Sequence, residues 1–220
     1  MSDDSLLVNG SSEAPITLVL AHGAGAPMDS HFMNTVAEAI GGTDVRVVRF
    51  EFPYMAARRT SGKRHAPDRE PVLIESWWSV IARLGSVAGL VIGGKSLGGR
   101  IASMIADEVG AAGLVCLGYP FHPPGNPGRL RVKHLENLRT PALIIQGSRD
   151  SFGRPDEVMD YHLSKKIRII WIEAGDHSLK PPARSGRTEV QNLADAISEV
   201  RRFLADLKLS TGQPTPLRSG

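Results

Sequence analysis

Apolar residues occur along the chain in continuous runs rich in valine, isoleucine and leucine, and polar segments separate these runs. A strand buried on one face alternates apolar and polar residues, whereas a strand covered on both faces is apolar throughout. The runs therefore predict strands of a mainly parallel sheet with helices over both faces. They are ITLVLAHG from residue 16, VRVVRFEFP from 45, GLVIGG from 89, GLVCLGYP from 113, PALIIQG from 141 and IRIIWIEAG from 167.

Amphipathic segments lie between the runs, and strands that alternate with helices indicate a doubly wound α/β fold. The stretch LLVNG near the start predicts one further, antiparallel strand. At 220 residues the chain fits a single domain, which we place at residues 1–209, and we expect the polar segment 210–220 to be a flexible tail. The expected helices lie near residues 30–41, 71–85, 97–109, 155–165 and 188–207.

Composition narrows the classes of function. Apolar residues make up 41% of the chain and charged residues 22%, which is typical of a globular protein. The formal net charge of +3 comes from 26 basic and 23 acidic residues, so we expect no nucleic-acid partner. We find neither a secretory leader nor an apolar run of about 18 residues, and we predict a cytoplasmic protein without a membrane segment. The single cysteine, Cys116, has the apolar neighbours of a core residue.

The stretch GLVIGGKSLGG matches two motifs that are chemically incompatible. Gly89 together with Gly94, Lys95 and Ser96 fits the phosphate-binding pattern G-x-x-x-x-G-K-[ST]. Gly94, Ser96 and Gly98 fit the G-x-S-x-G pattern of serine nucleophiles. A phosphate loop needs its strand to end before the first glycine, but the residues that follow Gly89 are strand-like. The second pattern needs a strand, a sharp turn and a helix in that order, so we favour Ser96 as a nucleophile.

A serine nucleophile needs a base and an acid, and candidates follow later strands in the order serine, acid, histidine. Asp150 follows PALIIQG, and His177 follows IRIIWIEAG. Because the carboxyl ends of parallel strands meet at one edge of a sheet, we expect both side chains to lie near Ser96. Asp176 is a rival acid, but residues adjacent in sequence project apart, so we choose Asp150. Taken singly, these residues fit a helix cap and a loop histidine; their joint placement favours a triad.

A serine hydrolase also needs two donors that stabilise the negative oxygen of its tetrahedral intermediate. The helix after the serine offers the amide of Leu97, and the small residues of HGAGAP offer the amide of Ala24. The HGAGAP loop is not a dinucleotide-binding G-x-G-x-x-G, because Met28 stands at the third glycine position. We expect His22 to brace this loop by hydrogen bonds and to border the substrate.

The motifs make the chain similar to the α/β-hydrolase superfamily over almost all of residues 15–208. More narrowly, the chain resembles a branch of small bacterial hydrolases related to vertebrate testis-expressed hydrolase-like proteins and to a hydrolase-like subunit of a histone acetyltransferase complex. Dienelactone hydrolases are structurally similar but use cysteine where this chain has Ser96. The resemblance implies Ser96, Asp150 and His177 as the triad and implies no particular substrate. It rests on HGAGAPMDS, GGKSLGGR, GYPFHPPGNP, QGSRDSFG and EAGDHSL.

Further features near the predicted site bear on the substrate. The segment between the strands at 113–120 and 141–147 is too short for the helical cap of many superfamily members, so we expect a minimal fold with an open site. The basic segment RRTSGKRHAPDRE begins with Arg58 and Arg59, which are candidates to attract an anionic substrate. The alternative is a solvated loop. His122 follows a strand at the same edge and either lines the pocket or holds a rigid prolyl loop.

The sequence therefore predicts a capless α/β-hydrolase that cleaves an ester or thioester bond of a small-molecule acyl substrate. His177 is the base and then the acid, Asp150 orients it, and the mechanism requires no metal and no organic cofactor. One alternative is a non-catalytic protein-binding module on the same scaffold, and another is nucleotide hydrolysis through the phosphate-loop match. The acyl group, the leaving group and the oligomeric state are left open.

Overall fold

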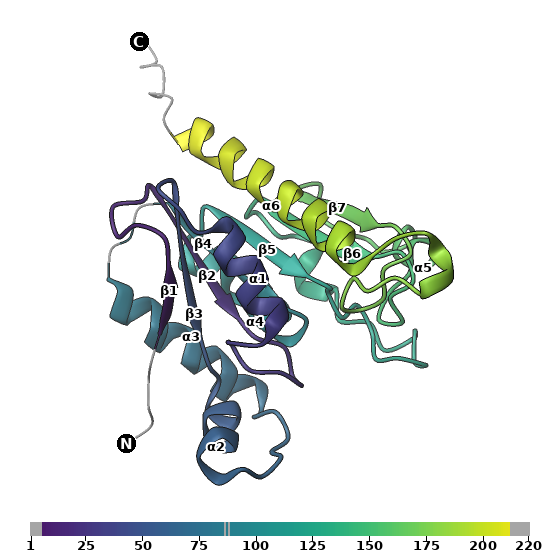
Figure 1. The fold of residues 1–220 in the computed structure, drawn as a ribbon, viewed down its shortest axis with the longest axis horizontal. Helices are drawn as coiled ribbons and strands as arrows, with labels where there is room; N and C mark the ends of the chain where they lie inside the picture. Colours follow the sequence, from purple (N-terminus) through teal and green to yellow (C-terminus); the bar gives the residue numbers. More distant parts are fainter. Residues whose placement is uncertain (1–5, 86, 88, 212–220) are drawn as a thin grey trace.

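A mainly parallel sheet forms the centre of the molecule (Figure 1). The computed structural model describes residues 6–85, 87 and 89–211. The seven-stranded sheet has the order β1-β3-β2-β4-β5-β6-β7, in which β1 pairs antiparallel with β3 and the other pairs are parallel. The strands are β1 (Leu7–Asn9), β2 (Ile16–Ala21), β3 (Val45–Phe50), β4 (Leu90–Lys95), β5 (Gly113–Leu117), β6 (Ala142–Gly147) and β7 (Ile167–Ile172).

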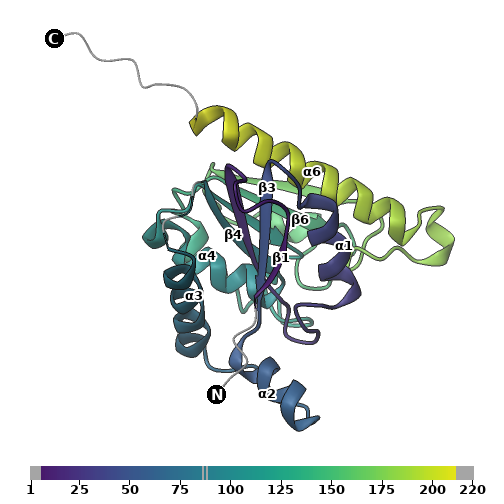
Figure 2. The same ribbon diagram turned by 60° about the vertical axis from the view of Figure 1, so that its left-hand side comes forward.

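Helices cover both faces of the sheet, as Figure 2 shows. Two of them, α3 (Glu70–Leu84) and α4 (Leu97–Val109), lie over one face, whereas α1 (His31–Ile40) and α6 (Glu189–Thr211) lie over the other. The doubly wound α/β fold predicted from the sequence is confirmed, including its single antiparallel strand. The shorter helical segments are α2 (Pro53–Ser61), α5 (Pro155–Val158) and the 3₁₀ turns η1 (Lys133–Leu135) and η2 (Ala183–Ser185).

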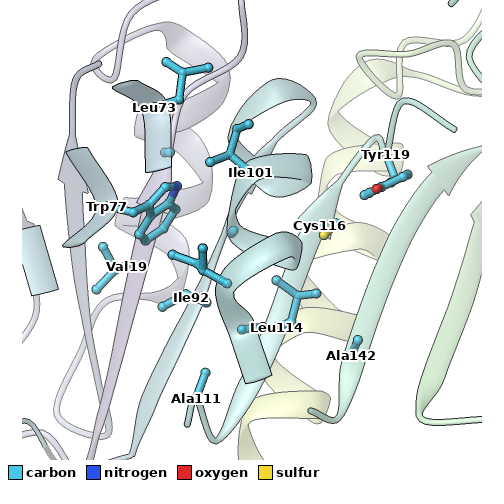
Figure 3. Close-up of a cluster of buried hydrophobic side chains, with 14 of the residues drawn as sticks. Val19, Leu73, Trp77, Ile92, Ile101, Ala111, Leu114, Cys116, Tyr119 and Ala142 are labelled. Atoms are coloured by element: carbon cyan, nitrogen blue, oxygen red, sulfur yellow. The ribbon is translucent and has the colours of Figure 1, made fainter. Parts of the chain in front are cut away.

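The central strands are apolar on both faces because each face is covered by helices. In β2, Leu18 and Leu20 pack in the cluster under α1 and α6, whereas Val19 between them packs under α3 and α4. Successive side chains of a strand point to opposite faces, so a doubly covered strand keeps no polar face. Figure 3 shows the cluster under α3 and α4, in which Trp77 is fully buried. Its ring meets that of Phe50 edge-on, with centroids 4.8 Å apart.

Two segments differ from the sequence prediction. The helix expected over 155–165 ends at Val158, where later amides such as that of Tyr161 bond three residues back and turn the chain. The basic segment expected to be a loop begins inside α2, which stands beyond the end of β3 (Figure 1). Pro53 is the first residue of α2, and Gly62 ends it in the left-handed conformation with φ of 67°. Proline at the start and glycine just past the end are common helix limits.

No helical cap is inserted between β5 and β6. Every residue of this connection is described, and it contains the short η1 turn but no α-helix, which confirms the capless prediction. At the other end of the chain, α6 continues to Thr211, past the start of the predicted flexible tail, and residues 212–220 lie outside the described residues. Among the helices that the structure describes, none is both long enough and apolar enough to cross a bilayer.

Candidate active site

Ser96 lies at the sharp turn between β4 and α4. Its backbone has φ of 51° and ψ of −112°, an unusual conformation that costs a residue with a side chain about 1–3 kcal/mol. The Ser96 amide donates to the Leu117 carbonyl at 3.0 Å and so ties the turn to β5. This geometry holds the serine side chain out from the carboxyl edge of the sheet.

Gly94 and Gly98 flank the turn because the neighbouring strand leaves no space for a side chain at either position. A Cβ atom at Gly94 would lie 2.2 Å from the Ala21 carbonyl oxygen, and a Cβ atom at Gly98 would lie 2.3 Å from the same oxygen. Both distances are far shorter than van der Waals contact. The two glycines of G-x-S-x-G are therefore required by the close approach of β2 to the turn.

The structure does not support the competing phosphate-loop match. A phosphate loop binds through free backbone amides between its first glycine and its lysine. Here Leu90 to Gly93 lie inside β4 and pair with β2 and β5 on either side. The match therefore contains no loop in which a phosphate could sit, as the apolar character of these residues predicts.

A chain of hydrogen bonds runs from Ser96 through His177 to Asp150. The Ser96 hydroxyl and the His177 Nε2 lie 2.7 Å apart, and the His177 Nδ1 and the Asp150 Oδ2 also lie 2.7 Å apart. Ser96 follows β4, Asp150 follows β6 and His177 follows β7. The parallel sheet thus brings together at one edge three side chains that are far apart in sequence.

The Asp150 carboxylate is fully buried, and both of its oxygens accept hydrogen bonds. Oδ2 accepts from the Gln146 side-chain amide at 2.8 Å in addition to His177, and Oδ1 accepts from the Phe152 backbone amide at 2.9 Å. These donors compensate the carboxylate for its loss of water. They also fix the oxygen that faces the imidazole, so Asp150 can hold the ring in one orientation.

The rival acid Asp176 has other partners. Its Oδ1 accepts from the backbone amides of Ser178 and Lys180, at 2.8 and 2.9 Å. Asp176 therefore stabilises the turn that carries His177, whereas Asp150 contacts the ring itself.

The surroundings of His177 favour a neutral imidazole. Burial is the largest cause that lowers the pKa of His177, and the positive charge of Lys95 also lowers it, while the bond to Asp150 opposes both. The Phe152 ring packs against the imidazole, with ring centroids 4.1 Å apart. A neutral ring whose Nδ1 proton faces Asp150 has an electron pair on Nε2, directed at Ser96, as a general base requires.

The loop after β2 lies beside the serine. A Cβ atom at Gly23 would lie 3.7 Å from the Ser96 Cβ, in ordinary van der Waals contact with it. Ala24 follows, and Leu97 is the first residue of α4. Within the described residues, neither the Ala24 amide nor the Leu97 amide donates a hydrogen bond to another group of the protein. The role of these two amides as the oxyanion hole stays a prediction.

His22 and His122 are buried, with exposed fractions of 0% and 2%. The His22 Nδ1 donates to the Gly23 carbonyl at 2.7 Å, and its Nε2 accepts from the Phe52 amide at 3.1 Å. The His122 Nδ1 donates to the Pro123 carbonyl at 2.9 Å, and its Nε2 lies 3.4 Å from a glutamate of α5. Both rings are enclosed and brace loops, as expected for His22 and as one of the two alternatives for His122. That either ring borders the substrate stays a prediction.

The two candidate arginines of α2 have different partners. Arg59 is paired with Asp29 at 2.5 Å and with Glu51 at 2.6 Å, and its bonds to Glu51 and Asp29 raise the pKa of Arg59. Arg58 donates instead to the Gly25 carbonyl at 3.3 Å, and no carboxylate of the described residues pairs with it. The structure therefore leaves the charge of Arg58 open to other groups, whereas that of Arg59 is neutralised.

Comparison with known proteins places this arrangement in a family. A family model described as an alpha/beta hydrolase domain matches residues 14–205. The chain belongs to the alpha/beta hydrolase domain family.

Solved structures are similar to this hydrolase-family chain over nearly its whole length. Est1E from Butyrivibrio proteoclasticus has a TM-score of 0.69 and 11% identity, and the match covers 93% of this chain and 94% of that chain. A serine hydrolase without a lid from Xanthomonas campestris has a TM-score of 0.63 and 17% identity, covering 96% and 90% respectively. A dienelactone hydrolase from Anabaena variabilis has a TM-score of 0.65 and 17% identity, covering 91% and 90%. These likenesses confirm the fold.

The alpha/beta hydrolase site also contains residues that sequence reasoning missed. Gln146 and Phe152 hold Asp150, and Lys95 donates to the His177 carbonyl at 2.6 Å. Lys95 occupies a variable position of G-x-S-x-G, and Gln146 is the one polar residue in the run PALIIQG. A polar residue inside a fully buried strand needs a partner, and that signal was available for Gln146.

Proposed function

We propose that the protein is a serine hydrolase that cleaves an ester or thioester bond through an acyl-enzyme on Ser96. The observation that carries the proposal is the pair of 2.7 Å hydrogen bonds that link Ser96, His177 and Asp150. Membership of the alpha/beta hydrolase domain family supports a hydrolase. The absence of an inserted cap between β5 and β6, where every residue is described, favours a small-molecule acyl substrate that needs no enclosure.

In the first half of the reaction, the His177 Nε2 takes the hydroxyl proton as the Ser96 Oγ attacks the acyl carbon. The carbonyl electrons move to its oxygen, which accepts hydrogen bonds from the Ala24 and Leu97 amides. Asp150 stabilises the imidazolium. His177 then gives its proton to the leaving oxygen or sulfur, the bond to that atom breaks, and the acyl group stays on the serine.

The second half uses the same groups with water as the nucleophile. His177 takes a proton from water while the hydroxide attacks the acyl carbon, and the same two amides hold the negative oxygen. The Ser96 Oγ then leaves with the proton from His177. The free acid departs, and each residue returns to its starting protonation state without a cofactor entering any step.

The charge distribution of α2 supports an anionic substrate bound through Arg58. The guanidinium contacts Gly25, two residues along the loop from Gly23, which packs against Ser96. A guanidinium that pairs with no carboxylate of the described residues is suited to bind a carboxylate of the acyl or alcohol part. Arg59, which the sequence also indicates, is already neutralised by Asp29 and Glu51.

Substrate selection by charge tests this part of the proposal. We expect Arg58→Ala to lower kcat/KM about tenfold for an acidic ester relative to a neutral ester of the same size, since a charged hydrogen bond contributes about 1.5–3 kcal/mol. Lys63→Ala, at an exposed position beyond α2, is the matched control. An unchanged ratio in Arg58→Ala would show that Arg58 does not bind the substrate.

Labelling by a fluorophosphonate tests the nucleophile itself. The native chain should be labelled, and the label should be lost in Ser96→Ala and in His177→Ala but kept in Asp176→Asn. Circular dichroism of each variant checks that the fold is retained. A folded native chain that takes no label would overturn the hydrolase proposal and leave the non-catalytic binding module.

A further inference from the structure

The side chain of Lys95 lies directly behind the candidate triad, and the steps above do not use it. Lys95 is the last residue of β4 and precedes Ser96 in the chain. Its Nζ donates to the His177 backbone carbonyl at 2.6 Å. The same Nζ lies 5.7 Å from the centre of the Phe32 ring, within the range of a cation–π contact. One ammonium therefore connects the nucleophile strand to the turn that carries the histidine.

Gly118 leaves space for the end of this side chain, and Gly23 lies beside its stem. A Cβ atom at Gly118, where φ is 70°, would lie 2.9 Å from the Lys95 Nζ and 2.8 Å from the His177 carbonyl oxygen. A Cβ atom at Gly23 would lie 3.4 Å from the Lys95 Cγ. A side chain at Gly118 would therefore occupy the place where the ammonium and the carbonyl meet.

The charge of Lys95 is held at a cost to stability. Lys95 is partly exposed, yet burial is still the largest influence on its ammonium and lowers the pKa of Lys95 to about 8, against the opposing influence of Asp150 and Asp176. Asp150 and Asp176 each have hydrogen-bond donors of their own. The hydrogen bond that the structure gives the ammonium is to a neutral carbonyl, and no carboxylate of the described residues pairs with it directly. Its charge is therefore only partly compensated by Asp150 and Asp176.

We propose that Lys95 is a positioning residue, which ties the His177 backbone to the nucleophile strand and keeps the His177 ring in the neutral form that accepts the serine proton. The tie acts on the backbone next to the ring, whereas Asp150 acts on the ring. The ammonium charge opposes a second positive charge on the imidazole nearby. This inference rests on the hydrolase function proposed above.

The kinetic test compares Lys95→Met, which removes charge and donor, with Lys95→Gln, which keeps a donor without the charge. We expect Lys95→Met to lower kcat about 10- to 100-fold with KM changed less than about threefold, because small displacements of a catalytic group have effects of this size. Both variants should move the acid limb of kcat/KM to higher pH, since both lose the charge. Lys95→Gln should recover part of kcat while its acid limb stays displaced.

The result that overturns the inference is a folded Lys95→Met enzyme with the native kcat and the native acid limb. A loss of kcat without movement of the acid limb in either variant would overturn the electrostatic half and leave the backbone tie. A merely structural role would change stability and KM but would not move the acid limb in the same direction in both variants.

A second measurement does not depend on activity. Carbon-13 labelling of histidine, with assignment by His177→Ala, gives the pKa of His177 by NMR, and we expect this pKa to be higher in Lys95→Gln than in the native chain. If neither Lys95 variant folds, the native His177 resonance should show a second inflection at higher pH, as Lys95 loses its charge. A single-step titration over the whole pH range in which the chain stays folded would overturn the inference. Failure of fluorophosphonate labelling would overturn the hydrolase proposal instead, so the two failures are distinguishable.

Discussion

The substitution Asp150→Asn removes the negative charge of the acid and keeps the shape of its side chain. In the native chain, the Oδ2 atom accepts hydrogen bonds from His177 and Gln146, and Oδ1 accepts from the Phe152 amide. If the new amide nitrogen takes the Oδ2 position, two donors face it. If the amide is flipped, its nitrogen faces the Phe152 amide instead. The site offers no orientation in which the asparagine satisfies every native partner.

When the new amide nitrogen takes the Oδ2 position, a change of tautomer in His177 removes the conflict between the two facing donors. Nδ1 then accepts from the asparagine, and the proton moves to Nε2, which faces the Ser96 hydroxyl. A protonated Nε2 cannot take the serine proton. Loss of the productive tautomer in a serine triad costs about 10⁴-fold in kcat, which corresponds to about 5 kcal/mol of transition-state stabilisation. The unsatisfied buried donor should also lower the free energy of unfolding by about 1–3 kcal/mol.

The assay is kcat for an activated ester, together with urea unfolding of the same preparations. Asp176→Asn is the matched control, because Asp176 is adjacent to the histidine but bonds only to backbone amides of its own turn among the described residues. We expect the control to keep kcat within about tenfold, since it leaves the ring tautomer unchanged. The reasoning is refuted if Asp150→Asn keeps activity within tenfold of native while Asp176→Asn abolishes it.

Three further outcomes follow from the geometry. Because the pKa of His177 lies below its ordinary value of 6.5, the neutral base persists into mildly acidic solution, and the acid limb of kcat/KM should fall below pH 6.5; a limb above it would contradict this. Gly98→Ala should inactivate the protein or lower its free energy of unfolding in urea by at least about 1–3 kcal/mol, because the new Cβ would lie 2.3 Å from the Ala21 oxygen. Gly128→Ala is the control and should have neither effect, since a Cβ there would have no atom within 4 Å. Burial raises the pKa of the Cys116 thiol, so a disulfide reagent should modify it only in denaturant, and rapid modification of the native chain would count against the core packing.

The features that sequence analysis predicted correctly are those with a local or periodic cause. The apolar runs identified each long strand, because a strand covered on both faces has no polar side. Gly94 and Gly98 indicated the turn around Ser96, because close backbone approach excludes other residues at those positions. The positions of Asp150 and His177 followed from strand order in a parallel sheet, which determines the edge at which their loops emerge.

The features that the sequence left open concern contacts made at a distance. Whether His22 and His122 face substrate or protein depends on enclosure by other segments, which local sequence does not specify. Arg58 and Arg59 are adjacent and chemically identical. Within the described structure, only Arg59 pairs with carboxylates, which are Asp29 in the loop after β2 and Glu51 just after β3. The helix α2 is a different case, because the sequence analysis expected a loop there although Pro53 and Gly62 mark the limits of a helix in the sequence.

Distant contacts of the same kind hold in place the loop that we propose as part of the oxyanion hole. Backbone amides stabilise a developing charge strongly only when they are held in place before the reaction, and the HGAGAP sequence by itself favours mobility. Arg49 donates to the Met28 carbonyl at 2.9 Å, Arg59 pairs with Asp29, and His22 bonds to the Phe52 amide. All three tie the loop to β3 and to the segment that follows it. Part of the basic charge of α2 therefore fixes the loop through Arg59, and in the proposed function Arg58 is the arginine that binds the substrate.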